Sequence, residues 1–207
     1  MKKNTLPKIY FFTIILLIVI TGINPKNTGA WLGEAIPVLL ATIILALTHT
    51  KFRFSLTSYT LIFGYLLFPL IGGYYTYSAI ELPFKEIFQR NYLDRIVHFL
   101  SGLLLAIPLK ELFVRTSKVK KYWSYIVPIA IIIAAGAIYE IAEWIVVILI
   151  NPQTSIAFLG AQGDIWDAQK DMLMAGIGAV LAMIISYQMK NEKNNSTRSR
   201  SKNNFIK

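Results

Sequence analysis

The chain has 207 residues, and 55% of them are hydrophobic before glycine is counted. Soluble domains reach only about 45–50% with glycine included, and about 25% of their residues are charged. Here the charged fraction is 15%. A soluble domain of this length could not bury so much apolar surface, so the composition predicts a membrane protein. The chain has no cysteine, which excludes disulfide scaffolds, thiolate metal sites and cysteine nucleophiles.

Six apolar stretches follow one another along the chain, and a helix needs about 20 mainly apolar residues to cross a bilayer. They run roughly over 9–23, 30–47, 56–75, 94–113, 122–150 and 164–189. The sequence therefore predicts an all-α, polytopic membrane helix bundle with about six transmembrane helices in residues 1–189. Residues 190–207 are rich in Asn, Ser and Lys, which predicts a disordered basic cytoplasmic tail.

The first apolar stretch has a second interpretation. Residues 1–8 are basic and residues 9–20 are apolar, which is the pattern of a secretory signal peptide. Thr28 and Ala30 would supply the small residues of a cleavage site, but they lie rather far from the apolar core. We interpret the stretch as a membrane helix and keep cleavage as the alternative.

The basic residues predict the orientation of the bundle. Sixteen of the 21 lysines and arginines lie on the side that holds both termini, and five lie on the other side. Cytoplasmic loops carry the excess of Lys and Arg, so both termini are predicted to be cytoplasmic. Basic clusters beside membrane helices meet the anionic inner leaflet, which explains the net charge of +10. The lipid bilayer is therefore the predicted partner, and we do not expect nucleic acid to be one.

Nine of the eleven acids lie on the opposite side, and three consecutive predicted helices carry six of them. Polar residues three or four positions apart share one face of a helix. Such sets are Asp94 and His98, then Glu140 and Glu143, then Asp164, Asp167 and Asp171. All of them fall at the outer ends of their helices. The sequence therefore predicts one polar site in the outer half of the bundle, built by about residues 91–187.

Two glutamates on one face within the membrane are difficult to explain by packing alone. A carboxylate at the centre of a membrane helix costs about 2.5–3.5 kcal/mol, and two nearby carboxylates also repel each other. The six acids of the predicted site, with Arg95 and Lys170, carry a charge of −6 + 2 = −4. Such a site needs shared protons, divalent cations or a cationic ligand.

Several carboxylates and one imidazole suit a divalent metal such as Mg, Mn, Fe or Zn. The predicted ligands are Asp94, His98, Glu140, Glu143, Asp167 and Asp171. Within this set, His98, Glu140 and Asp167 are the predicted catalytic residues, because an imidazole and carboxylates transfer protons. The predicted supporting residues are Arg95, Gln162, Asp164 and Lys170.

Simpler interpretations exist for single members of the site. Asp164 at the start of a helix is typical of an N-cap, and Asp94 beside Arg95 is typical of a helix-start acid with an ion-pair partner. A lone His98 would more often be a hydrogen-bonded packing residue than a ligand.

Three segments carry a family resemblance, over 94–99, 139–144 and 159–172. Together they resemble the YjdF-like family of bacterial inner-membrane proteins, and the third segment is the most specific. That resemblance implies a multi-pass protein of the bacterial inner membrane and brings no established reaction. The layout is also loosely similar to the VanZ-like group, which would imply an envelope or antibiotic-tolerance context.

The predicted site is compatible with three functions. The first is an outward-facing, metal-dependent enzyme that acts on a lipid or lipid-linked envelope substrate. The second is a cation or proton transporter, which a polar trail continuing to the cytoplasmic side would favour. The third is a non-catalytic membrane component, which full pairing of the acids with cations would favour. A site closed inwards and open outwards would favour the enzyme.

Overall fold

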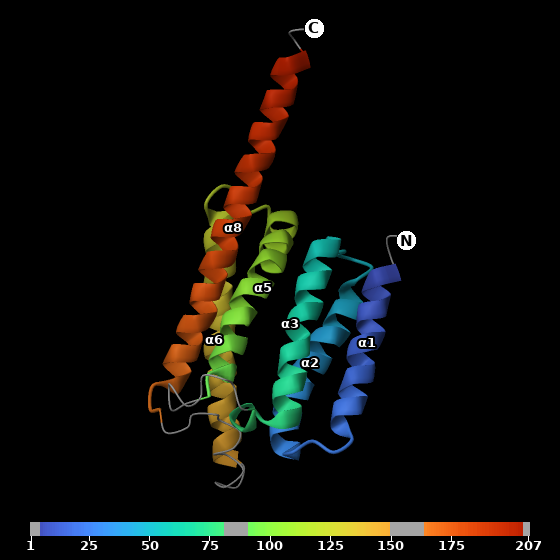
Figure 1. Ribbon diagram of the computed structural model, residues 1–207, viewed down its shortest axis with the longest axis vertical. Coiled ribbons are helices and arrows are strands. Elements are labelled where there is room, and N and C mark those ends of the chain that lie inside the picture. Colours follow the sequence, from blue (N-terminus) through green and yellow to red (C-terminus); the bar gives the residue numbers. More distant parts are fainter. Residues whose placement is uncertain (1–4, 81–90, 150–163, 205–207) are drawn as a thin grey trace.

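The computed structural model describes residues 5–80, 91–149 and 164–204, and these form six long α-helices and one short 3-10 helix (Figure 1). The long helices are α1 (Thr5–Gly22), α2 (Thr28–Thr48), α3 (Leu56–Tyr75), α5 (Leu93–Thr116), α6 (Trp123–Leu149) and α8 (Asp167–Asn204), and η1 is Tyr77–Ala79. All six are long and apolar enough to cross a membrane. The predicted all-α bundle with six spans is confirmed.

The helices form two groups of three. α1, α2 and α3 pack together, α5, α6 and α8 pack together, and contacts between α3 and α5 join the groups (Figure 1). The first group buries Ile14, Val38 and Leu70 between its helices. The second group buries much smaller side chains, notably Ala106 and Ala179. Many other large apolar side chains remain exposed, as expected for helices that face lipid.

α5 and α8 approach each other more closely than ordinary side chains would allow. A Cβ atom on Gly102 would overlap the carbonyl oxygen of Ala175, and one on Gly178 would overlap the carbonyl oxygen of Phe99. Small residues let helix backbones approach closely in membranes, where van der Waals contact drives association. This contact sets the first turns of α8 against the first turns of α5.

Both ends of the chain lie at the same end of the bundle (Figure 1). The cytoplasmic location of that end stays a prediction. α1 is integrated into the bundle, because Ile14 is buried and Trp31 Nε1 of α2 donates to Thr21 Oγ1 at 3.0 Å. Cleavage after α1 likewise stays an untested alternative.

The predicted disordered tail differs from the structure, in which α8 continues as one helix to Asn204. The C-terminal part of α8 projects beyond the bundle in Figure 1. Once a helix is nucleated, each further residue adds a hydrogen bond without a new nucleation cost. The membrane-spanning part of α8 can therefore propagate helix into a polar segment that composition alone predicts to be disordered.

Candidate functional site

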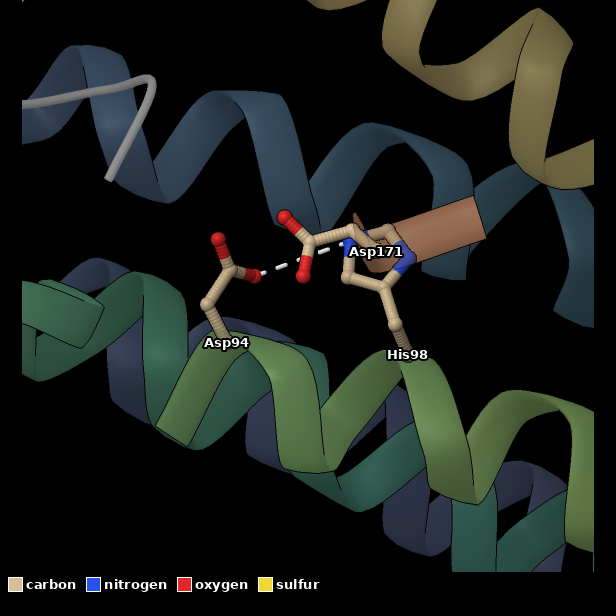
Figure 2. A group of neighbouring side chains, drawn as sticks. All are labelled: Asp94, His98 and Asp171. Atoms are coloured by element: carbon tan, nitrogen blue, oxygen red, sulfur yellow. Dashed lines mark ion pairs between the residues drawn. The ribbon is translucent and has the colours of Figure 1, made fainter. Parts of the chain in front are cut away.

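The start of α5 supplies the first two residues of the site. Asp94 and His98 lie one turn apart, and His98 Nε2 is 3.7 Å from Asp94 Oδ1 (Figure 2). Buried Asn91 fixes this start: its Nδ2 donates to the carbonyl of Tyr77 at 2.7 Å, and its Oδ1 accepts from Leu93 N at 2.9 Å. The helix therefore begins at a defined point, which places Asp94 and His98 at a defined depth.

α8 supplies the third residue, Asp171. Figure 2 shows its carboxylate directed towards Asp94 and His98. One ligand atom from each of the three residues lies within 4.8 Å of the other two. We call Asp94, His98 and Asp171 the ligand group. Two donors on opposite sides of an ion with bonds of about 2.0–2.2 Å are about 4–4.4 Å apart, so the ligand group is close to metal-binding distance.

Asp171 is the most deeply buried acid of the site. Its side chain is only 3% exposed, and Oδ1 has no hydrogen-bond partner among the described residues. Arg95 Nε lies 3.8 Å from Oδ1, which is an ionic contact longer than a hydrogen bond. A buried carboxylate oxygen without a donor is costly, and a bound cation would remove that cost.

α6 adds Glu140 to the ligand group. Its Oε1 lies 3.5 Å from His98 Nε2, its side chain is 11% exposed, and Oε1 also has no hydrogen-bond partner among the described residues. Glu143 stands one turn further along α6. The structure therefore sets Glu140 beside the imidazole and does not include Glu143 in the ligand group.

A separate set of ion pairs surrounds Arg95, which lies on α5 beside Asp94. Arg95 Nη2 donates to Asp164 at 2.6 Å and to Asp167 at 3.2 Å, and Lys170 Nζ donates to Asp164 at 2.7 Å. Asp164 Oδ1 also accepts from the N–H of Trp166, which forms an Asx turn just before α8 begins at Asp167. The hydrogen bonds from Lys170 and Arg95 hold the pKa of the Asp164 carboxyl well below its usual range.

The structure thus divides the residues predicted from sequence. Asp94, His98 and Asp171 meet, Glu140 adjoins them, and Arg95 and Lys170 are supporting residues that bind Asp164. Asp167, a predicted ligand and catalytic residue, is instead hydrogen-bonded to Arg95. The physical reason is depth, since Asp167 lies one turn, about 6 Å, before Asp171 on α8. Gln162 lies outside the described residues.

One acid of the site was missed by the sequence prediction. Glu34 of α2 is 7% exposed, and its Oε1 accepts from the Tyr139 hydroxyl at 3.0 Å. Tyr139 in turn has its ring edge-on to His98, with centroids 6.0 Å apart. The signal in the sequence was that Glu34 is the only acid within the first three helices. Nothing in the spacing of α2 alone connects it to α5 or α6.

The ligand group fits a divalent cation in charge and chemistry. Two carboxylates and a neutral imidazole balance a charge of +2, and mixed oxygen and nitrogen donors suit Mn, Fe or Zn. A metal at this position would lower the pKa of a bound water or polarise a phosphoryl oxygen. Glu140 lies outside the group but adjoins His98, so it could accept a proton there.

Comparison with known proteins identifies the family. Residues 6–192 match the family model described as predicted membrane protein (DUF2238). The chain belongs to the DUF2238 family. It is similar to the inner membrane protein YjdF of Escherichia coli (strain K12), with 33% identity over 178 residues, covering 83% of this chain and 84% of that protein. No solved structure matches.

Membership of DUF2238 confirms the predicted resemblance to YjdF-like proteins and the predicted location in a bacterial inner membrane. With its six candidate spans, the chain is a multi-pass integral membrane protein. The looser similarity to VanZ-like proteins stays a prediction.

Proposed function

We propose that this DUF2238 protein is a metal-dependent membrane enzyme in which Asp94, His98 and Asp171 hold a divalent cation. Two observations carry the proposal: one ligand atom from each of the three residues lies within 4.8 Å of the other two, and the buried Asp171 Oδ1 lacks a hydrogen-bond donor among the described residues. Glu140, 3.5 Å from His98, is the proposed general base.

The depth of the site supports a lipid or lipid-linked envelope substrate. Asp94 and Asp171 lie within the first two turns of α5 and α8, and Glu140 lies in the second half of α6. On the predicted orientation this is the outer part of the membrane, which a headgroup of the outer leaflet can reach. On α5, the cavity lining changes from the polar Asp94, His98 and Ser101 to the apolar Leu105. This change along α5 supports an enzyme over a transporter.

A non-catalytic role is the second candidate, and the Arg95 ion pairs favour it. Arg95 contacts Asp164, Asp167 and Asp171, so part of the acidic cluster already has a cation. The ligand group and Glu140 are not explained by these pairs, because Arg95 reaches Asp171 only at 3.8 Å. The Arg95 ion pairs are therefore consistent with a structural role, and the ligand group with Glu140 is consistent with metal binding.

The first prediction is metal binding by the ligand group. Protein purified in detergent should carry about one equivalent of Mn, Fe or Zn, and after chelation added Mn or Zn should raise its melting temperature. Asp171→Asn removes one charged ligand. It should weaken metal binding by at least about tenfold, because even mutation of the groups that orient metal ligands costs about 10–100-fold in affinity. Glu192→Gln is the matched control, since it removes an exposed carboxylate from the same helix. Equal metal response in Asp171→Asn and wild type would contradict the site.

Catalysis is tested separately with Glu140→Gln. This variant keeps the three ligands, so it should bind metal while losing the proton acceptor. Wild-type protein incubated with an extract of bacterial membrane lipids and Mn should generate products by mass spectrometry that Glu140→Gln does not. Metal binding without any wild-type product would favour the non-catalytic role.

A further inference from the structure

A polar cavity lies next to the ligand group, where the two groups of helices meet. Its volume is about 150 Å³. Asp94, His98 and Ser101 of α5 form one wall. The opposite walls carry Glu34 of α2, Tyr65 of α3, Tyr77 of η1 and Tyr139 of α6. The cavity therefore shares two residues with the ligand group and reaches into the half of the bundle that the ligand group does not use.

The cavity is acidic and aromatic. Its lining contains two carboxylates and three tyrosines and includes no lysine or arginine. Glu34 is 7% exposed, receives the Tyr139 hydroxyl at 3.0 Å and has Tyr77 as a second hydrogen-bond partner. These are neutral donors, so an ionised Glu34 would have no cationic counterpart in the cavity wall. A cationic occupant would supply one.

Two glycines at the end of α3 build this pocket. A Cβ atom on Gly72 would overlap the ring of Tyr77, and a Cβ atom on Gly73 would lie 2.9 Å from Glu34 Cβ. The Gly-Gly pair therefore lets the Tyr77 ring and the α2 backbone both lie directly against α3. It brings Glu34 and Tyr77 to the same point at the cavity wall.

We propose that this cavity binds an organic ammonium group, with Glu34 as the counter-ion and the tyrosines as its aromatic walls. The combination of a carboxylate and aromatic rings is the arrangement that recognises primary and quaternary ammonium ions. The apolar side chains of Val97, Leu105 and Ile132 also line the cavity and suit the carbon atoms around the nitrogen. A volume of 150 Å³ equals about five waters at about 30 Å³ each, which is larger than a single inorganic ion requires.

An ammonium site here would make an amine-bearing or choline-type headgroup the substrate class of the proposed enzyme. Only this substrate role of the cavity rests on the proposed function. Ammonium binding to Glu34 does not need a metal. The two proposals therefore fail separately: Asp171→Asn tests the metal, and chelator-treated protein tests the cavity.

The test uses the full chain in nanodiscs after chelation, with choline and ethanolamine as probes. Both should raise the melting temperature, whereas the neutral isostere of choline, with tert-butyl in place of trimethylammonium, should not. Glu34→Gln keeps a hydrogen-bond acceptor for Tyr139 but removes the charge, and should weaken choline binding by roughly tenfold or more. Glu192→Gln should bind choline like wild type. Equal responses to choline and its isostere, or unchanged binding in Glu34→Gln, would overturn the proposal.

A second variant, Ser101→Leu, tests the cavity independently in case Glu34→Gln does not fold. Ser101→Leu fills the cavity from α5 and leaves Glu34 in place, and it should also abolish the response to choline. Retained binding in a folded Ser101→Leu protein would count against the cavity as the site.

The source of the ammonium group is resolved by nanodisc composition. If the ligand is a lipid headgroup, wild-type protein should retain phosphatidylethanolamine over phosphatidylglycerol in native mass spectrometry, and Glu34→Gln should lose that preference. If the ligand is a free amine, soluble choline should bind equally in both lipids without any retained lipid. Absence of both lipid preference and choline binding would refute an ammonium site.

Discussion

Arg95 connects the start of α5 with the start of α8, two parts of the site that lie far apart in sequence. Its guanidinium bonds to Asp164 and Asp167, and the side chain is only 12% exposed. A planar guanidinium can serve several carboxylates at once, which an ammonium does less well. Arg95 therefore balances the acids at the start of α8, while Asp171 one turn deeper remains directed towards His98.

Replacement of Arg95 tests this division. Arg95→Gln would leave the buried carboxylates without their shared cation, and removal of one partner of a buried ion pair costs about 3–5 kcal/mol. We expect a clear drop in melting temperature in detergent. Lys170→Gln is the matched control, because Lys170 binds the same Asp164 but is 45% exposed, and exposed pairs contribute about 0–1 kcal/mol. Equal losses in the two variants would contradict a central role for Arg95.

At the scale of helices, the α5–α8 contact positions the ligand group. Gly102 and Gly178 each meet backbone atoms of the opposite helix, so the two axes cannot shift apart without changing the distance from Asp171 to His98. The alanines beside these glycines, such as Ala106 and Ala179, are completely buried. A contact made of backbone and methyl groups leaves few alternative packings, which fixes the rotation of α8 about its own axis.

Two glycines of α8 form a matched pair for testing this contact. In Gly178→Ala the new methyl group would overlap backbone atoms of Phe99, and overpacking of this kind costs about 1–3 kcal/mol. In Gly176→Ala the methyl group would meet only the end of the Ile133 side chain at 3.4 Å. A glycine-to-alanine change inside a helix otherwise stabilises by about 0.5–1 kcal/mol.

We therefore expect Gly178→Ala to melt at a lower temperature than Gly176→Ala and to lose metal response together with stability. Thermal melting in detergent, with and without added Mn, measures both effects. A Gly178→Ala protein that melts at or above the temperature of Gly176→Ala would show that the two helices are free to separate.

At the scale of the whole molecule, six crossings place both termini at one end (Figure 1). That end also has a structural anchor, because Glu111 of α5 accepts hydrogen bonds from the backbone N–H of Ser55 at 2.7 Å and from the Ser58 hydroxyl. The site lies at the opposite end, so the orientation of the bundle decides which side of the membrane the site faces.

Topology is the prediction that belongs to this scale. A reporter that is active only outside the cytoplasm should be silent when it is fused after Lys207, because the excess of Lys and Arg places that end inside. The same reporter fused after Ile80, which follows three helices, should be active. The reverse pattern would move the ligand group and the cavity to the cytoplasmic face, and with them the proposed access for outer-leaflet lipids.

The class of the protein and the depth of its polar residues can be predicted from the sequence alone. Apolar stretches long enough for a bilayer predict helices almost independently of context, because every backbone polar group in lipid must be bonded within its own helix. For the same reason, the position of an acid along its stretch predicts its depth. Asp94, His98, Glu140 and Asp171 were therefore predicted to lie at one level of the bundle.

Which of these residues meet depends on how the helices pack, and the sequence pattern does not contain that information. Spacing defines a face on one helix but not the rotation and shift of that helix against its neighbours, and these depend on packing contacts such as Gly178 against Phe99. A shift of one turn separates Asp171, which faces His98, from Asp167, which bonds to Arg95. Glu34 joins the site from α2 because helices distant in sequence pack side by side, a contact that no local pattern contains.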